Sequence, residues 1–249
     1  METIGDAVFS ECNLEFGDII LPKIKTIGGA FSGGYSATKL MNISKLQLGD
    51  TLTEIKTTAF YWVSINCDLT IMHGKIDQQA FQHSVIEGKL RIGKDVTLDK
   101  GAFQDTTVKN GVVFDEGRVA IPESCFNGSM VTGTVVIPSS VTSIGAYAFY
   151  TLTSASMELY LYADPYRLPA TLPDMIFETP NLQYYVNVPT GNYAGFVARY
   201  GNKYRWTELT NMPLKVYYKD SDGYWKQGIM WYKNSDGWLK CGIPYIKRN

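Results

Sequence analysis

Histidine and cysteine, the residues that most often hold metals or act as nucleophiles, are scarce in this sequence. It has two histidines, His73 and His83, and four cysteines without a Cys-x-x-Cys motif or an even spacing. A metal site needs clustered ligands, and no Gly-x-Ser-x-Gly motif adjoins either histidine to indicate a Ser–His–acid triad. We therefore expect no metal, no cofactor and no enzymatic activity. We interpret the cysteines as free thiols, three of them packed as small apolar groups. They are Cys12, Cys67, Cys125 and Cys241.

An excess of one charge and a long apolar run are also missing. The formal net charge is −1, so no basic field is present to hold nucleic acid or a membrane surface. Residues 214–249 carry seven Lys or Arg and three Asp, a charge of +4, and the remainder carries 16 basic and 21 acidic residues, a charge of −5. No run approaches the ~20 apolar residues of a membrane-spanning helix. We expect neither nucleic-acid binding nor membrane insertion.

A periodic phenylalanine is the main feature that the sequence does contain. Its spacings are 22, 29, 21, 22, 23, 23 and 28, so five of the seven lie within 21–23 residues. An apolar residue stands five positions before the Phe in seven copies, as Ile144 does before Phe149, and four positions before it in the copy at Phe31. A period of ~20–29 residues is typical of solenoids with one strand per turn. The eight residues are Phe9, Phe31, Phe60, Phe81, Phe103, Phe126, Phe149 and Phe177.

Each period also contains a short strand pattern. Two apolar residues separated by one residue follow the Phe, and such a pair forms one buried face of a strand. No unit can close a core alone, so we expect neighbouring units to stack and bury a continuous apolar column. The pairs are Ile19 and Leu21, Leu46 and Leu48, Leu69 and Ile71, Leu90 and Ile92, Val112 and Phe114, Val135 and Ile137, Leu159 and Leu161, and Val186 and Val188.

The segment 137–149, IPSSVTSIGAYAF, resembles the repeat of BspA-like leucine-rich-repeat proteins, whose units read approximately I-P-x-S-V-T-x-I-G-x-x-A-F-x-x-C. The segment 4–12, IGDAVFSEC, is similar to the same unit and includes the cysteine. The resemblance covers residues 1–213 and implies a mainly β leucine-rich-repeat solenoid of about eight degenerate coils of 21–23 residues. The Ala-Phe pair of the repeat recurs at 30–31, 59–60, 80–81 and 102–103.

The last unit, VNVPTGNYAGFVARYG at 186–201, changes from a strand to a helix. Its apolar residues follow the i, i+3, i+4, i+7 pattern of one helix face. We expect a helix over about 191–200 that Thr190 or Asn192 caps and Gly201 ends. The resemblance implies the same, because a strand and helix of this form often close BspA-type arrays. The residues of the face are Tyr193, Phe196, Val197 and Tyr200.

A shorter repeat follows Pro213. YYKDSDGYWKQG at 217–228 returns as WYKNSDGWLKCG at 231–242, and each copy has an Asp-Gly pair between aromatic-rich runs, which is a hairpin signal. We expect a small antiparallel β-hairpin tail over 214–249. A calcium loop would need further oxygen ligands and a closing Glu, and none is present. The tail resembles hairpins at the ends of some phage fibre proteins and the aromatic repeats of choline- and glucan-binding modules.

Two groups of residues are candidates for ligand binding. Residues between the buried strand positions face outward, either as plain sheet surface or as a flat stripe for a protein partner. Aromatic residues of the tail either form a small core, because a two-stranded hairpin alone is marginal, or stack on sugar rings or on a neighbouring chain. The outward row, with both valines expected to be exposed, is Thr70, Arg91, Val113, Val136, Tyr160 and Asn187. The tail aromatics are Tyr218, Trp225, Trp231, Tyr232 and Trp238.

These features favour a non-enzymatic binding or adhesion module that contacts a protein or a cell-surface glycan. The resembled family is typically one of adhesins of bacteria and protists, and related repeats occur in phage virion proteins. No signal-peptide pattern precedes the first repeat. We therefore expect a phage virion fibre or decoration protein, and the alternative is a fragment of an exported bacterial surface adhesin. A carbohydrate-binding tail on a solenoid spacer is a third hypothesis.

Assembly is the remaining expectation from the sequence. An end coil without a cap exposes an open edge strand and bare core, so we expect upstream chain or a partner to cover the first coil. A virion protein is expected to form a homotrimer or a larger assembly through the N-terminal coil or the tail. The expected location is the virion, or the extracellular space and cell surface.

Overall fold

The structure is a computed structural model of the whole chain. It describes residues 1–10, 15–33, 40–150, 157–173, 175–179, 182–183, 185–201, 203–209, 214–219, 225–230, 233–234 and 237–238, with the backbone alone at 178–179, at 182–183 and beyond 209. The chain divides into two compact units, Met1–Glu208 and Leu209–Asn249. The boundary after residue 213 that the sequence predicts remains a prediction.

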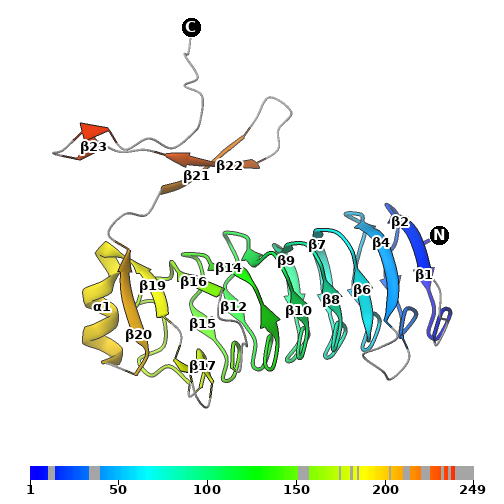
Figure 1. Cartoon of the computed structure of the whole chain (residues 1–249), viewed down its shortest axis with the longest axis horizontal. Coiled ribbons are helices and arrows are strands. Elements are labelled where there is room, and N and C mark those ends of the chain that lie inside the picture. The colour runs from blue at the N-terminus through cyan, green and yellow to red at the C-terminus, as the bar shows by residue number, and fades with distance from the viewer. Residues whose placement is uncertain are drawn as a thin grey trace, which may run out of the picture. The chain divides into compact units, whose positions relative to one another are not determined.

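The first unit is a solenoid in which each repeat forms one coil (Figure 1). Its main sheet has ten strands in the order β1-β3-β5-β7-β9-β11-β14-β16-β19-β20, and neighbours from β1 to β19 pair in parallel. The strands are β1 (Thr3–Ile4), β3 (Thr26–Ile27), β5 (Glu54–Ile55), β7 (Leu69–Ile76), β9 (Leu90–Leu98), β11 (Val112–Phe114), β14 (Gly133–Ile137), β16 (Met157–Leu161), β19 (Tyr185–Pro189) and β20 (Arg205–Leu209).

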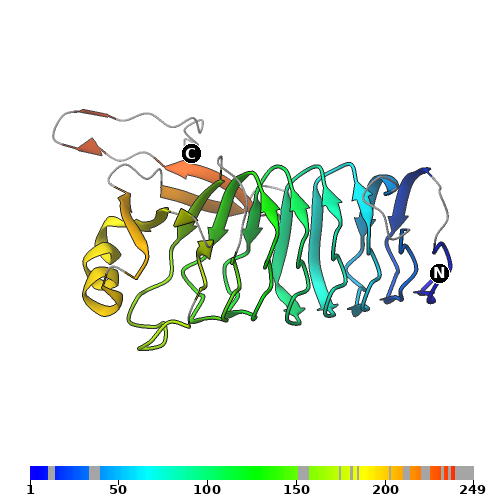
Figure 2. The ribbon, with the colours of Figure 1, turned by 60° about the horizontal axis from the view of Figure 1, so that its bottom comes forward.

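A second parallel sheet forms another side of the stack, in the order β13-β10-β8-β6-β4-β2 (Figure 2). A short parallel pair, β12 (Ala120–Ile121) with β15 (Ser143–Ile144), and an antiparallel pair, β17 (Glu178–Thr179) with β18 (Leu182–Gln183), complete the unit. The strands of the second sheet are β2 (Glu15–Leu21), β4 (Met41–Leu48), β6 (Val63–Ile65), β8 (Val85–Ile86), β10 (Thr107–Val108) and β13 (Met130–Val131).

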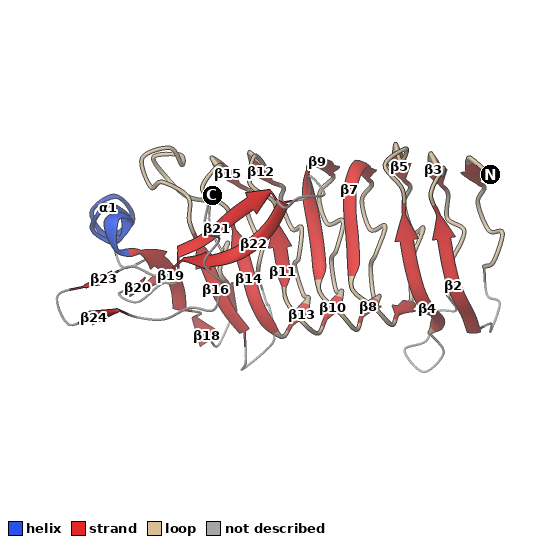
Figure 3. Ribbon diagram, turned by 90° about the horizontal axis from the view of Figure 1, so that it is seen from above, coloured by secondary structure: helices blue, strands red, loops and turns tan. Residues whose placement is uncertain are grey.

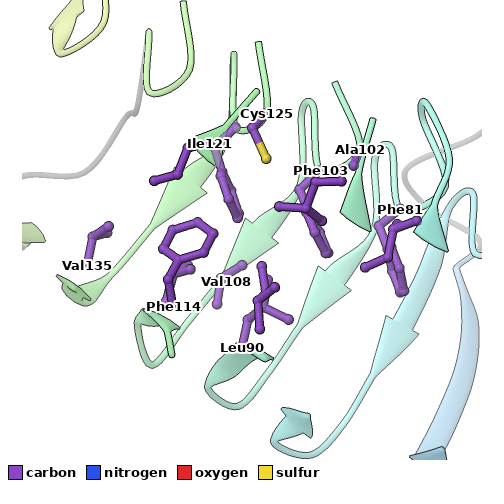
Figure 4. Packing of buried hydrophobic residues seen from close by; sticks show 14 of the residues in the cluster. Phe81, Leu90, Ala102, Phe103, Val108, Phe114, Ile121, Cys125 and Val135 are labelled. Carbon is purple, nitrogen blue, oxygen red and sulfur yellow. The ribbon is translucent and has the colours of Figure 1, made fainter. Parts of the chain in front are cut away.

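The core is a column of phenylalanine rings along the stack. From Phe31 to Phe177, the rings of successive coils lie with centroids 4.9–5.8 Å apart and planes within 4–16° of parallel. This spacing follows that of neighbouring strands, ~4.8 Å, because each coil contributes one ring. Figure 4 shows Phe81 and Phe103 in the interior with the apolar strand residues Leu90 and Phe114. The periodic Phe from Phe31 onward and the strand pairs from Leu69 onward are therefore confirmed as core, whereas Phe9, Ile19, Leu21 and Leu48 are only partly buried.

Residues on both sides of the periodic Phe along the chain have a left-handed backbone conformation. Residues two positions before the Phe have positive φ in seven coils, and residues two positions after it do so in four. Most of them are not glycine, and Trp62 and His83 have φ values of 56° and 58°. The positions before the Phe are Ala7, Thr58, Gln79, Gly101, Ser124, Tyr147 and Met175, and those after it are Trp62, His83, Asp105 and Gly128.

Helix α1 (Thr190–Tyr200) and β20 close the array at the end of β19 (Figure 3). Phe196 is fully buried, and its ring lies 4.7 Å from that of Trp206, whose Nε1 donates to the Gly201 carbonyl at 3.0 Å. Tyr193, Val197 and Tyr200 pack against the core, as the predicted helix face requires. Capping by Thr190 or Asn192 was wrong, because the N-cap is Pro189 and no side chain caps the helix.

The second unit contains two antiparallel strand pairs, as the tandem aromatic repeat predicts. β21 (Leu214–Lys219) pairs with β22 (Trp225–Met230), with Leu214 opposite Met230 and Lys219 opposite Trp225. β23 (Lys233–Asn234) pairs with β24 (Gly237–Trp238). The chain is therefore mainly β, with a solenoid closed by one short helix and a tail of antiparallel pairs.

Candidate binding surface

The six residues predicted to face outward lie in one row across the main sheet. Register pairs join them one to the next, from Thr70 through Arg91 to Asn187. The residues on either side of each member along its strand point inward and are fully buried in the central coils, as Val112 and Phe114 are around Val113. We call Thr70, Arg91, Val113, Val136, Tyr160 and Asn187 the outer row.

The outer row is less exposed than the sequence indicated. Thr70 is exposed, and Arg91, Val113, Tyr160 and Asn187 are half-buried. The expectation that Val136 is exposed was wrong, because the side chain is only 5% exposed although it lies outside the main core. Its in-register neighbours are Val113 and the larger Tyr160, which flank the short valine one strand spacing away on each side.

Hydrogen bonds hold the polar members of the outer row in place. Arg91 donates from Nε to Asp115 Oδ1 at 2.8 Å and from Nη2 to Oδ2 at 3.1 Å, which is a bidentate ion pair. Asn187 Nδ2 donates to the Leu159 carbonyl at 3.0 Å. The row therefore presents side chains with fixed positions.

The Tyr160 hydroxyl is the third fixed polar group. It donates to Glu158 Oε2 at 2.9 Å. Burial raises the pKa of Tyr160, and the Glu158 carboxylate raises it further. The phenol therefore stays protonated and remains a donor at neutral pH.

Pairs of opposite charge one repeat apart are a feature that the interpretation of the sequence missed. Asp115 follows Arg91 by 24 residues, Asp99 follows Lys75 by 24, and Lys109 follows Glu87 by 22. Their nitrogen–oxygen distances are 2.8, 2.8 and 2.7 Å. The signal was available, because parallel coils bring residues one period apart into register.

Packing accounts for His83, and His73 is a half-buried strand residue. The His83 ring stacks on Trp62 with centroids 4.5 Å apart, and His73 Nε2 lies 3.9 Å from Asp50 Oδ1. In the described part of the chain, no group of three or more His, Cys, Asp or Glu residues is placed to hold a metal ion.

The two described cysteines, Cys67 and Cys125, are free thiols. Cys67 is half-buried, and Cys125 is fully buried. Burial raises the pKa of the Cys125 thiol to about 12. Cys12 and Cys241 lie outside the described residues.

Arg118 is a buried charge with a structural role. It is 5% exposed, and its Nη2 donates to the carbonyls of Gly93 and Val96 in the preceding coil. Its guanidinium lies 5.9 Å from the centre of the Phe114 ring. Burial lowers its pKa, while the carbonyl contacts favour the charged form. Nothing in this arrangement is open to a substrate.

The tail aromatics are only partly placed. Tyr218 and Trp225 lie opposite Lys226 and Lys219 in the β21–β22 pair, and Trp238 lies in β24 opposite Lys233. Only the backbone is described at these three positions. Trp231 and Tyr232 lie outside the described residues. Sugar stacking by the tail remains a prediction.

Comparison with known proteins identifies the family. The sequence matches the BspA type leucine-rich repeat region, in six copies, over residues 1–109 and 33–158. Comparisons with curated proteins and with solved structures gave no match. Within the described residues, no helix has the length and apolar character needed to cross a membrane. Repeats of this family are typical of surface-associated, protein-binding modules. The chain belongs to the BspA-type leucine-rich-repeat family.

Proposed function

We propose that the chain is a non-enzymatic adhesion module, displayed on a surface, that binds a partner protein through the outer row. The observation that carries the proposal is the register that aligns six outward side chains across neighbouring parallel strands. A repeat array offers an extended face rather than a pocket, and such faces bind other macromolecules. The membership in a family of typical surface and adhesion modules supports the same function.

The composition and rigidity of the outer row suit a protein partner. Val113 and Tyr160 are half-buried, lie on either side of the buried Val136 and form the apolar centre, and Arg91 and Asn187 flank it with polar groups. Protein interfaces have this pattern, with an apolar centre that contains aromatic residues and a polar rim. Because Arg91, Tyr160 and Asn187 are already held by hydrogen bonds, their ordering costs little on binding.

The experiment is binding of the fluorescently labelled full chain to a panel of intact bacterial and epithelial cells. Binding that protease treatment of the cells removes, and that Val113→Glu abolishes, supports a protein partner at the outer row. The matched control is Val119→Glu, because Val119 is 58% exposed and lies outside the row. Binding that Val113→Glu leaves unchanged overturns the proposal.

A phage virion fibre or decoration protein is the finer form of this proposal. It is supported by the tandem hairpin tail, with its two antiparallel strand pairs, and by the resemblance of that tail to fibre ends. It includes self-association as a trimer through the N-terminal coil or the tail. The alternative is a piece of an exported bacterial adhesin.

A carbohydrate-binding tail is the candidate from a different class. The tail aromatics Tyr218, Trp225, Trp231, Tyr232 and Trp238 support it. In the cell-binding experiment, this candidate predicts binding that survives protease treatment of the cells and is lost after their periodate oxidation. Binding is also expected to be lost in the triple variant that combines Trp225→Ala, Trp231→Ala and Trp238→Ala. Retention of binding in that variant contradicts it.

A further inference from the structure

We propose that Tyr185 and Arg205, at the end of the outer row that Asn187 occupies, form a site that binds an acidic side chain, Asp or Glu, of the partner protein. The inference rests on the proposed function, because it names the chemistry by which a protein partner is held. Neither residue belongs to the outer row, and the site extends the binding surface from β19 to β20.

Tyr185 supplies the exposed aromatic side chain that the outer row lacks. It lies two residues before Asn187 in β19, so both residues face outward, while Val186 between them is fully buried. Tyr185 is 63% exposed, whereas the apolar members of the outer row are half-buried or buried. Among the described strands of the main sheet, no other large apolar side chain is as exposed. Tyr185 therefore offers a partner more accessible apolar area than any member of the outer row.

Arg205 is held against the ring of Tyr185. Its strand, β20, is the neighbour of β19 in the main sheet (Figure 1). Arg205 is exposed, and its guanidinium carbon lies 5.6 Å from the centre of the Tyr185 ring. A guanidinium that stacks on an aromatic ring keeps the N–H groups at its edge available for hydrogen bonds. The ring therefore positions a cation without using its donors.

The guanidinium of Arg205 is not used within the solenoid. Among the described residues, no carboxylate forms an ion pair with it. By contrast, Arg91, Arg118 and Arg199 all donate to groups of the chain itself. The group that matches a guanidinium best is a carboxylate, which accepts two parallel N–H bonds. Arg205 is therefore a positioned donor for a carboxylate from outside the chain.

Glu158 sets the direction in which an acidic group can be placed. Leu159 and Val186 are register partners, so the residues before them, Glu158 and Tyr185, are neighbours across the sheet. Glu158 is exposed, and its Oε2 accepts the hydrogen bond from the Tyr160 hydroxyl. Tyr185 thus lies between a negative group on β16 and a positive group on β20. A partner carboxylate is attracted at one side and repelled at the other, which fixes its orientation.

The combination of residues favours a protein carboxylate as the occupant. Tyrosine and arginine are enriched among the residues that dominate the energy of protein interfaces. An apolar group beside the partner's carboxylate packs on the Tyr185 ring while the carboxylate binds Arg205. Because the ring already restricts the guanidinium, little side-chain freedom is lost on binding.

The test measures the affinity of fluorescently labelled full-chain variants for the cells of the panel at several salt concentrations. We expect Tyr185→Ala and Arg205→Gln each to weaken binding at least about tenfold. Arg205→Gln also makes binding less sensitive to salt, because it removes the charge and leaves a side chain of similar length. Arg205→Lys, which keeps the charge without the planar pair of donors, is expected to have an intermediate affinity.

The matched controls are Tyr166→Ala and Arg167→Gln. Tyr166 is 67% exposed, Arg167 is also exposed, and both lie outside the main sheet. Neither control is expected to change the affinity or its salt dependence. Substitutions at exposed positions change stability little, and equal urea midpoints of the variants show that a loss of binding is not a loss of structure.

Val113→Glu separates this inference from the proposed function. If Val113→Glu abolishes binding while Tyr185→Ala and Arg205→Gln leave it unchanged, the outer row stands and the carboxylate site is overturned. Binding that survives protease but is lost after neuraminidase treatment of the cells assigns the carboxylate to a sialylated glycan, and also overturns the site. Absence of binding to every cell of the panel overturns both proposals.

Discussion

Phe103 lies in the middle of the ring column, with centroids 4.9 Å from Phe81 and 5.1 Å from Phe126, and is fully buried. Neighbouring rings are anchored in their own coils and cannot fill the space that the ring leaves. We expect Phe103→Ala to lower the free energy of unfolding by about 3–5 kcal/mol, measured by urea denaturation. Gln104→Ala, at the half-buried next position, is the control and is expected to change it by no more than ~0.5 kcal/mol. A loss below ~1 kcal/mol for Phe103→Ala would contradict a tightly packed column.

Ionisation of the Cys125 thiol is expected to lower the stability of the folded chain at alkaline pH. Its thiol is buried in the neutral form, and burial raises the pKa from 9.0 to about 12. The unfolded chain ionises this thiol near the lower value, so the contribution is complete below about pH 9 and is lost as the pH rises towards about 12. We expect the urea midpoint of the wild-type chain to fall between about pH 8 and about pH 11 by more than that of Cys125→Ala. Equal falls in both chains would show that Cys125 is not responsible.

At the scale of elements, α1 depends on the glycine at its end. Gly201 has φ 57° and ψ −144°, and its N–H donates to the Val197 carbonyl at 2.9 Å. A side chain is strained in this backbone conformation, so we expect Gly201→Ala to lower the free energy of unfolding by about 1–3 kcal/mol. Gly191→Ala is the matched control, because a Cβ there meets nothing within 4 Å and alanine favours the helix by ~0.4–1 kcal/mol. The unfolding temperatures of both variants are measured against the wild-type chain. If both temperatures shift in the same direction, α1 does not depend on glycine at position 201.

The elements that repeat were predictable, because their signals recur. A period of two is enough to recognise strand pairs such as Val112 and Phe114. A period near 22 is enough to recognise the Phe and the apolar residue that stands five positions before it in seven of the eight copies. The outer row followed from the same alternation, and the register pairs of the structure join its six members.

Other elements were not predictable in this way. Left-handed backbone at Trp62 and His83 gave no sequence signal, because glycine is the usual marker of that conformation. The low exposure of Val136 depends on side chains one coil away on each side.

At the scale of the whole molecule, the virion hypothesis predicts assembly. We expect the full chain to have the mass of a trimer by light scattering and a chain ending at residue 213 to be a monomer, because the aromatic tail would then be the assembly element. If both chains are monomers, the tail does not assemble the protein, and it is free to bind a ligand. A trimer in both chains would place the contact in the solenoid, at the N-terminal coil.

The central claim is that the outer row contacts a protein, and photo-crosslinking tests it most directly. A benzophenone amino acid is placed at position 113 in the outer row or at position 119, which is 58% exposed outside it, and each chain is irradiated on cells that bind the wild-type chain. Crosslinking from position 113 to one cell-surface protein, with none from position 119, is the predicted result. Crosslinking from position 119 alone would contradict contact at the outer row. So would the absence of crosslinking from both positions on cells that both labelled chains bind.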